Sequence, residues 1–271
     1  MKSVGTVITL GILWTAQPSF ANVAVVAGDC SGSLFKMPGM QDSEKALVLT
    51  AGHCVGVGSL DGRYPADGEV FLNHPASNSV IVRTTKNEPG ERIGYRRILF
   101  ASMTGTDLAV IELEASLREL VDRGYVVYSL APEMPKPGLT LEFDSYNRDV
   151  HSICEVDAIV PIVKEGSWTW ENSVRMRAGP ACQYQHGQSG TAGVEMRSKL
   201  IYAIAQTGYQ GGPPCSLNNP CEVHPGTRAT TTAQIDQGYA MPTAALLRCY
   251  DQARRRFDFD LGTCTLRGKT R

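Results

Sequence analysis

The sequence predicts an all-β protein. Three observations support this fold class. The 271 residues include 27 glycines and 15 prolines spread along the chain, and long helical patterns are scarce. The apolar runs are short and rich in Val, Ile, Thr or Tyr, and turn residues bound them, as is typical of antiparallel strands. The length suits one large domain or two small ones.

Residues 1–21 have the pattern of a secretion signal. They carry one charged residue, and an apolar run covers residues 4–14. Pro18 ends this run before a small-x-small pattern at Ala21, which is typical of a cleavage site. We expect export to the periplasm or the medium, with cleavage after Ala21 or else after Ala24. The run is too short to span a bilayer, so we expect no membrane association after cleavage.

Charge and cysteine content narrow the classes of function. A net charge of −1 lacks the basic excess of nucleic-acid-binding proteins, so no nucleic-acid partner is expected. Export places the eight cysteines in an oxidising compartment, where an even number favours disulfides. The sequence contains no Cys-x-x-Cys pair, so we expect no structural zinc ion. No other metal site or cofactor is expected, and a structural calcium ion is left open.

The strands of the first half begin with a hairpin. "CSGSLF" (30–35) and "ALVLTA" (46–51) flank a loop of turn formers and charges. Cys30 starts this hairpin and Cys54 follows it, so a disulfide between them would tie its two ends together. Further strands are expected at 22–28, 68–72, 79–85, 95–102 and 106–114.

Residues 115–137 have the character of a passage between two halves. One helix is expected near the end of the chain, over 242–257, where Pro242 suits a first turn and an apolar face follows at helical spacing. Before it, the second half has strand-like segments at 139–146, 152–163, 173–179 and 200–208.

His53 and Cys54 stand side by side at the end of "ALVLTAGHC". They could be metal ligands, packed residues without chemistry, or a general base held in place by a neighbouring disulfide. The metal interpretation has little support, because no paired ligands occur at short spacing. The choice between the other two depends on the rest of the chain.

A second stretch offers a nucleophile. "HGQSGTAG" places Ser189 between Gly187 and Gly190, where a substrate carbonyl can approach the backbone. The N–H groups of Gly187 and Ser189 could stabilise an oxyanion there. The elbow motif of α/β-hydrolases, Gly-x-Ser-x-Gly, is excluded because Thr191 follows in place of its last glycine.

Chain order adds a further distinction. His53, Asp107 and Ser189 occur in an order that differs from both the hydrolase and the subtilisin orders. "LTAGHC", "TDLAVIEL" and "GQSGTAG", in this order, resemble the three catalytic motifs of the chymotrypsin-like serine proteases, and "CSGSLF" resembles the strand before their histidine loop. The resemblance covers about residues 25–250.

The resemblance implies two six-stranded antiparallel β-barrels with the active site between them. The first barrel would span residues 22–125, and the second, with the C-terminal helix and tail, 126–271. It also implies a Cys30–Cys54 bridge. The chain would then be a secreted, monomeric serine endopeptidase acting on proteins or peptides.

Within this resemblance each catalytic residue has a role. His53 is the general base, Asp107 orients its imidazole, and Ser189 is the nucleophile. Asp144 and Asp157 are weaker alternatives for the acid, because neither opens an apolar strand. Two other functions stay open: a catalytically silent protease fold that binds protein partners, and an esterase or other acyl hydrolase.

The residues before the nucleophile depart from the family's pattern. Gln188 replaces the aspartate that in animal trypsins pairs with a freshly cut N-terminus, so the chain resembles the bacterial glutamyl endopeptidases more closely. Gln183 stands at the base of the primary specificity pocket, which gives no support for a trypsin-like preference. Tyr184 could narrow that pocket.

Other candidate substrate contacts follow from the resemblance of "AIAQTG" to a wall of that pocket. His186 either touches substrate or lies exposed on its loop. Ile204 or Ala205 stands where glutamyl endopeptidases carry a histidine, so the specificity stays open. The candidate contacts on the wall are Ala205, Gln206, Thr207 and Gly208.

The remaining cysteines allow several pairings. Cys154–Cys182 would link the strands that flank the nucleophile loop, and this is the pairing we prefer. Pairing Cys182 with Cys215 or Cys221 would instead resemble the bridge at the rim of the specificity pocket. With the preferred pairing, Cys215–Cys221 closes the loop "CSLNNPC", and Cys249–Cys264 folds the tail onto the last helix.

Overall fold

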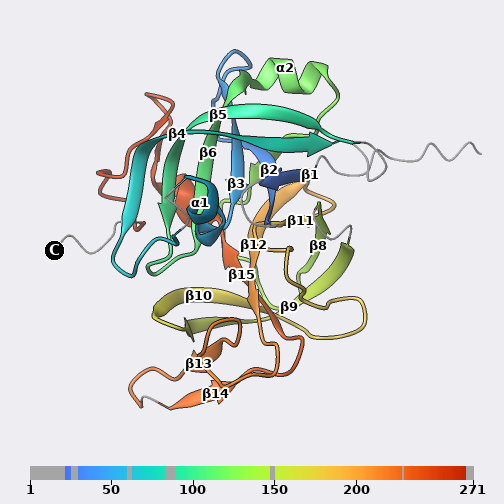
Figure 1. The fold of residues 1–271 in the computed structure, drawn as a ribbon, viewed down its shortest axis with the longest axis vertical. Coiled ribbons are helices and arrows are strands. Elements are labelled where there is room, and N and C mark those ends of the chain that lie inside the picture. The colour runs from blue at the N-terminus through green and yellow to red at the C-terminus, as the bar shows by residue number, and fades with distance from the viewer. Residues whose placement is uncertain are drawn as a thin grey trace, which may run out of the picture.

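The computed structural model describes residues 22–25, 30–59, 63–83, 89–146, 150–227 and 229–266. They form two six-stranded β-barrels stacked one above the other, as expected (Figure 1). The proposed signal peptide, residues 1–21, lies outside the described residues.

The upper barrel in Figure 1 is closed by its first strand. Its strands pair in the order β1-β4-β5-β6-β3-β2, and β1 also pairs with β2, so the ring has no open edge. Every pairing is antiparallel. The strands are β1 (Asn22–Val25), β2 (Cys30–Lys36), β3 (Lys45–Thr50), β4 (Val70–Arg83), β5 (Glu91–Ser102) and β6 (Leu108–Ser116).

The lower barrel closes in the same way. Its order is β12-β11-β8-β9-β10-β15, and β15 pairs back onto β12. A hairpin of β13 (Cys221–Val223) and β14 (Thr230–Thr232) extends from β9 at the bottom of Figure 1. The barrel strands are β8 (Thr140–Ser145), β9 (Val150–Glu165), β10 (Trp168–Met176), β11 (Ala192–Glu195), β12 (Leu200–Gly208) and β15 (Gly238–Pro242).

A short strand joins the two barrels. β7 (Tyr128–Leu130) pairs in parallel with β2 of the upper barrel and with β12 of the lower one. It follows α2 (Leu117–Asp122), whose capping box uses Ser116 and Glu119. The division that we predict between residues 125 and 126 stays a prediction.

The C-terminal helix is much shorter than predicted. α3 (Ala244–Arg248) gives way to the strand pair β16 (Tyr250–Asp251) and β17 (Arg256–Phe257). The apolar spacing alone suggested a continuous helix over 242–257, but the carboxylate of Asp251 accepts the N–H groups of two following residues and turns the chain. Phe259 then stacks on Phe100, so this segment returns to the upper barrel.

Two other elements differ from the sequence prediction. A helix, α1 (Gly52–Ser59), follows β3 directly, so His53 lies in a helix rather than on a strand end. The strands expected at 68–72 and 79–85 are parts of one strand, β4, whose register with β5 shifts between Pro75 and Asn78. β4 continues through this irregularity from Val70 to Arg83.

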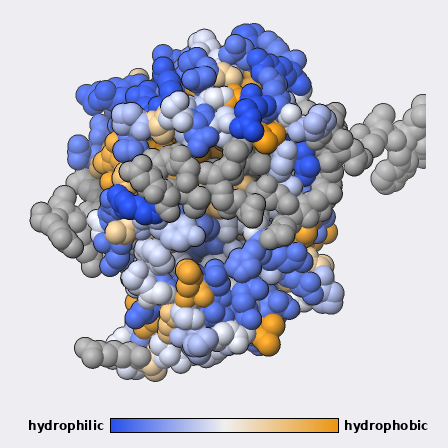
Figure 2. All heavy atoms as spheres, in the orientation of Figure 1, coloured by the Kyte–Doolittle hydropathy of each residue, from blue (hydrophilic) through white to orange (hydrophobic). Residues whose placement is uncertain are grey.

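On the face shown in Figure 2, the described residues present separate apolar groups. In Figure 2 hydrophilic residues cover most of the visible upper part, and hydrophobic residues form separate spots. No helix among the described residues has the length and hydropathy needed to cross a membrane. The exposed large hydrophobic residues are Tyr64, Leu72, Val121, Ile153, Leu217 and Ile235.

Candidate active site

His53 and Asp107 contact each other at the mouth of the upper barrel. Asp107 directly precedes β6, and its Oδ1 accepts the backbone N–H of His53 at 2.9 Å. Its Oδ2 lies 2.8 Å from Nδ1 of the imidazole. Only 1% of Asp107 is exposed, so the carboxylate depends on these partners. A buried carboxylate in this position holds the ring in one orientation and places the Nδ1 proton toward Asp107.

The glycine before His53 makes this approach possible. A Cβ on Gly52 would lie 2.0 Å from the carbonyl oxygen of Ser102 and 3.0 Å from Oδ1 of Asp107. Any side chain there would push α1 away from the carboxylate. The close packing of α1 on the end of β5 and on Asp107 therefore requires the glycine in "TAGHC".

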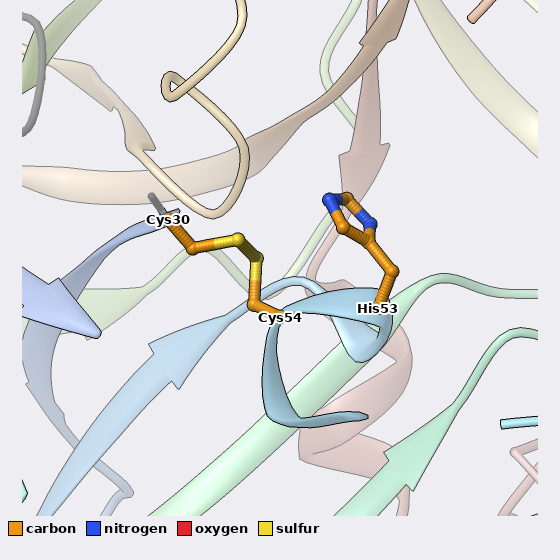
Figure 3. A group of neighbouring side chains, drawn as sticks. All are labelled: Cys30, His53 and Cys54. Carbon is orange, nitrogen blue, oxygen red and sulfur yellow. A yellow bond between two sulfur atoms is a disulfide. The ribbon is translucent and has the colours of Figure 1, made fainter. Parts of the chain in front are cut away.

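A disulfide anchors the same helix. Cys30, at the start of β2, is bonded to Cys54, and the imidazole of His53 points away from α1 beside this bridge (Figure 3). Cys30, His53 and Cys54 bring three potential metal-binding atoms within 4.8 Å of one another. Both sulfur atoms belong to the disulfide, however, and neither is available as a thiolate ligand. The disulfide therefore anchors the helix that carries His53 and supplies no metal ligand.

The other six cysteines are also paired as expected. Cys154–Cys182 links β9 to the segment before the nucleophile loop, so the alternative pairings of Cys182 are wrong. The two remaining bridges are Cys215–Cys221 and Cys249–Cys264.

The charge state of His53 depends on two carboxylates. Burial of the ring favours the neutral imidazole, but the charge of Asp107 and its hydrogen bond favour the protonated form. The charge of Glu165 acts in the same direction, and the net effect raises the pKa of His53 above its ordinary value. An imidazole of raised pKa is a stronger base.

Ser189 reaches the same region from the lower barrel. Its carbonyl accepts the N–H of Ser31 in β2 at 2.8 Å, which ties the nucleophile loop to the upper barrel. The next residue, Gly190, has a φ of +82°, and a Cβ there would lie 2.2 Å from the carbonyl oxygen of Ser31 and from Oγ1 of Thr50. The second glycine of "GQSG" is thus required by backbone conformation and by close packing.

The three side chains line one cleft of about 330 Å³ between the barrels. The rival acids Asp144 and Asp157 do not line it. The Ser189 hydroxyl is 3.0 Å from the hydroxyl of Tyr184 and donates at 3.4 Å to the carbonyl of Gln206. Within the described residues it forms no hydrogen bond with His53.

The loop before Ser189 is held by neutral hydrogen bonds. Oε1 of Gln188 accepts the N–H of Gln185 at 2.8 Å, and its Nε2 donates to Ser152 at 3.2 Å. This side chain is only 3% exposed. Gln188 therefore organises the loop without a charged partner.

The carbonyl of Gly187 is fixed from both barrels. It accepts hydrogen bonds from Oγ of Ser31 at 3.1 Å and from Oγ of Ser145 at 3.2 Å. The N–H groups of Gly187 and Ser189 donate to no acceptor in the described part of the chain. Two backbone donors beside the hydroxyl thus remain available to a ligand.

The predicted substrate contacts fall in different places. Tyr184, His186, Gln206 and Thr207 line the cleft together with Ser189. Gln183 and Ala205 do not line it: both border a cavity of about 30 Å³ behind Tyr184. Gly208 lies under the ring of Tyr184, where a Cβ would come within 2.4 Å of it.

Glu165 is a cleft residue that the sequence analysis did not identify. It ends β9, is 5% exposed, and accepts hydrogen bonds from Oγ1 of Thr207 and from the N–H of Asn218. Burial raises its pKa, and these hydrogen bonds oppose the rise. No motif surrounds Glu165 in the sequence, because its place in the cleft depends on contacts with Thr207 and Asn218, which are far away along the chain.

An aromatic wall on the other side of the cleft was also missed. The Tyr64 ring makes an edge contact with His53 at 6.3 Å between centroids, and another with Trp168 at 6.0 Å. The Trp168 indole donates to the carbonyl of Pro65 at 3.0 Å, while Trp170 is buried. Tyr64 and Trp168 therefore both line the cleft that contains His53 and Ser189.

Comparison with known proteins gives similarity in fold only. No protein-family description matches this sequence, and no curated protein matches it. Solved structures resemble the chain at low identity. Three of these solved structures are proteases or protease domains.

The MamO protease domain from Magnetospirillum magneticum is 14% identical, with a TM-score of 0.46 over 85% of this chain and 95% of that one. Neuropsin, a serine protease of mouse brain, is 14% identical, with a TM-score of 0.47 over 82% and 89%. A glutamic-acid-specific serine protease that uses a histidine triad in substrate binding is 15% identical, with a TM-score of 0.45 over 83% and 90%.

Proposed function

We propose that this chain is an exported serine endopeptidase with His53, Asp107 and Ser189 as its catalytic residues. One observation carries the proposal: Asp107 holds His53 through its ring at 2.8 Å and through its backbone at 2.9 Å, and Ser189 from the other barrel lines the same cleft. A carboxylate, an imidazole and a hydroxyl with these relations suit acyl transfer.

The reaction begins with a rotation of Ser189. Its Oγ leaves Tyr184 and Gln206, turns about the Cα–Cβ bond toward Nε2 of His53, and gives its proton to that nitrogen as it attacks the peptide carbonyl. Asp107 stabilises the imidazolium that forms. His53 returns the proton to the leaving amine as the C–N bond breaks, which leaves an acyl-enzyme that water hydrolyses by the same steps.

The oxyanion of the tetrahedral intermediate needs donors that are already in place. The N–H groups of Gly187 and Ser189 are suited to this role, because they donate to no acceptor in the described part of the chain and because Ser31 and Ser145 hold the Gly187 carbonyl. Each such donor contributes about 3–4 kcal/mol to the barrier reduction.

Four disulfides support export to an oxidising compartment, the periplasm or the medium. A cleft of about 330 Å³ suits a segment of peptide as the substrate. The likeness to glutamyl endopeptidases rests on Gln188, and Ala205 stands near where those enzymes carry a histidine, so we do not extend the proposal to glutamyl specificity.

The test is covalent labelling of the mature protein with a sulfonyl fluoride, followed by peptide mapping and a peptide-library assay. We expect modification at Ser189, loss of modification in Ser189→Ala, and peptide cleavage by the unmodified protein. Ser198→Ala, at an exposed serine of the same barrel, is the matched control and should label normally. Turnover of small esters without peptide cleavage would indicate an acyl hydrolase instead.

A second candidate is a catalytically silent fold that binds protein partners. The observation that favours it is the hydroxyl of Ser189, which bonds Tyr184 and Gln206 and not His53 in the described residues. Absence of both labelling and cleavage would favour this candidate over the endopeptidase.

A further inference from the structure

Tyr184 lies on a floor made of two glycines. Gly208 in β12 and Gly238 in β15 are cross-strand partners, so neither contributes a side chain to this part of the sheet. A Cβ on Gly208 would be 2.4 Å from Cδ1 of Tyr184, and one on Gly238 would be 3.3 Å from its Cβ. The Tyr184 side chain therefore occupies the space that the missing side chains leave open.

The same side chain extends from this floor to the nucleophile. Its hydroxyl lies 3.0 Å from Oγ of Ser189 and donates to the carbonyl of Gln206 at 3.1 Å. Two hydrogen bonds at one end and backbone contact at the other hold the ring in place. Burial favours the neutral phenol and raises the pKa of Tyr184, so the hydroxyl stays protonated at neutral pH.

Three spaces meet at this ring. Tyr184 lines the catalytic cleft of about 330 Å³, the cavity of about 30 Å³ behind it, and an outer pocket of about 310 Å³ that Gln183 and Gln210 also line. Truncation of the ring would join the cleft to the small cavity and would add the volume of the phenol to it. The ring thus acts as a partition.

The space behind the partition is apolar. Phe143, Met176 and Tyr239 contribute its larger walls, and no described residue that lines it carries a charge. A slot opened there would therefore accept a large uncharged side chain. It would not provide a partner for an acidic or a basic one.

We propose that Tyr184 closes the substrate side-chain slot from within and restricts cleavage to peptides with glycine, alanine or serine before the scissile bond. The inference rests on the proposed function. The carbon that Ser189 attacks is bonded to the Cα of that residue, so its side chain must enter the space beside Oγ. The phenol already occupies the side of that space formed by β12 and β15, so we expect a large side chain to be excluded from that side and a small one to be accepted.

The test compares three proteins on peptides that differ only in the residue before the scissile bond. We expect the native protein to prefer alanine over phenylalanine in kcat/KM by about tenfold or more. Tyr184→Ala should shift this ratio toward phenylalanine and leucine by about tenfold or more. Tyr184→Phe retains the ring without its hydroxyl and should keep the native ratio, which separates filling of the slot from the hydrogen bond to Ser189.

A measurement without turnover addresses the same cavity. Addition of p-cresol should raise the thermal midpoint of Tyr184→Ala, where the ligand replaces the lost ring, and should leave the native protein unchanged. If Tyr184→Ala does not fold, Tyr184→Ser takes its place in both assays, since it also removes the ring and leaves the space of the ring open.

The possible results separate this inference from the proposed function. Labelling of Ser189 together with equal cleavage after alanine and phenylalanine, or with a ratio that Tyr184→Ala does not change, overturns the inference and leaves the endopeptidase standing. Failure of all variants to label rejects the endopeptidase and, with it, the substrate restriction. Absence of any p-cresol effect on the truncated variant overturns the partition itself.

Discussion

Asp107 binds His53 twice, through the ring at Nδ1 and through the backbone N–H. The two hydrogen bonds use both carboxylate oxygens, so the acid determines where α1 begins as well as how the imidazole is turned. These two hydrogen bonds hold α1 close to Asp107 and to the end of β5. As a result, there is no room for a side chain on Gly52.

Replacement of the acid by its amide should remove most of the activity. Asp107→Asn keeps the size of the side chain, but its NH₂ group would favour the wrong imidazole tautomer and would no longer stabilise the cation. We expect kcat to fall by about 10⁴-fold. Asp67→Asn, at an exposed turn, is the control and should leave kcat unchanged. Steady-state assays of both variants test this prediction.

The second carboxylate of the cleft should tune the pH dependence. Activity requires neutral His53, so it falls as the pH drops through the pKa of His53, which Asp107 and Glu165 raise. Glu165→Gln removes one of these charges, and the acid limb of the kcat/KM profile should move to lower pH. Glu171→Gln, at an exposed position outside the cleft, should not move it. A limb that stays in place in Glu165→Gln would contradict this electrostatic role.

Gln188 should matter for both stability and rate. In Gln188→Ala the N–H of Gln185 loses its partner inside the loop, and we expect a loss of about 1–3 kcal/mol in the free energy of unfolding. Sulfonyl fluoride labelling of Ser189 should slow as well, because the loop before Ser189 would lose its hydrogen bonds to Gln185 and Ser152. Urea titration and labelling rates test the two effects. Gln185→Ala alters an exposed side chain of the same loop and serves as the control.

The disulfides should differ in their contributions to stability. Cys30–Cys54 spans 24 residues, and its replacement by two serines should lower the free energy of unfolding by about 3 kcal/mol. Cys215–Cys221 spans 6 residues, for which the chain-entropy relation predicts about 2 kcal/mol. Denaturant titrations of the two double variants should rank them in this order. The reverse ranking would show that strain or local packing outweighs loop entropy.

Short-range patterns determined much of this protein. Turn residues around short apolar runs predicted most of the strands. "TAGHC" and "GQSG" suggested His53 and Ser189 as candidates, and both residues line one cleft. The four cysteine pairs agree with those preferred from the sequence and its resemblance, where Cys182 had other possible partners.

Tertiary contacts decided the rest. The segment after Arg248 has helical spacing, yet Asp251 and the return of Phe259 to Phe100 turn it into a hairpin. Glu165 lines the cleft through its hydrogen bond with Thr207 of β12, and Tyr184 reaches the nucleophile through its hydrogen bonds with Ser189 and with Gln206 of β12. Such contacts join residues that are far apart in the chain. A local sequence pattern reflects only what one segment needs to form its own turn, strand or helix, so it does not predict these contacts.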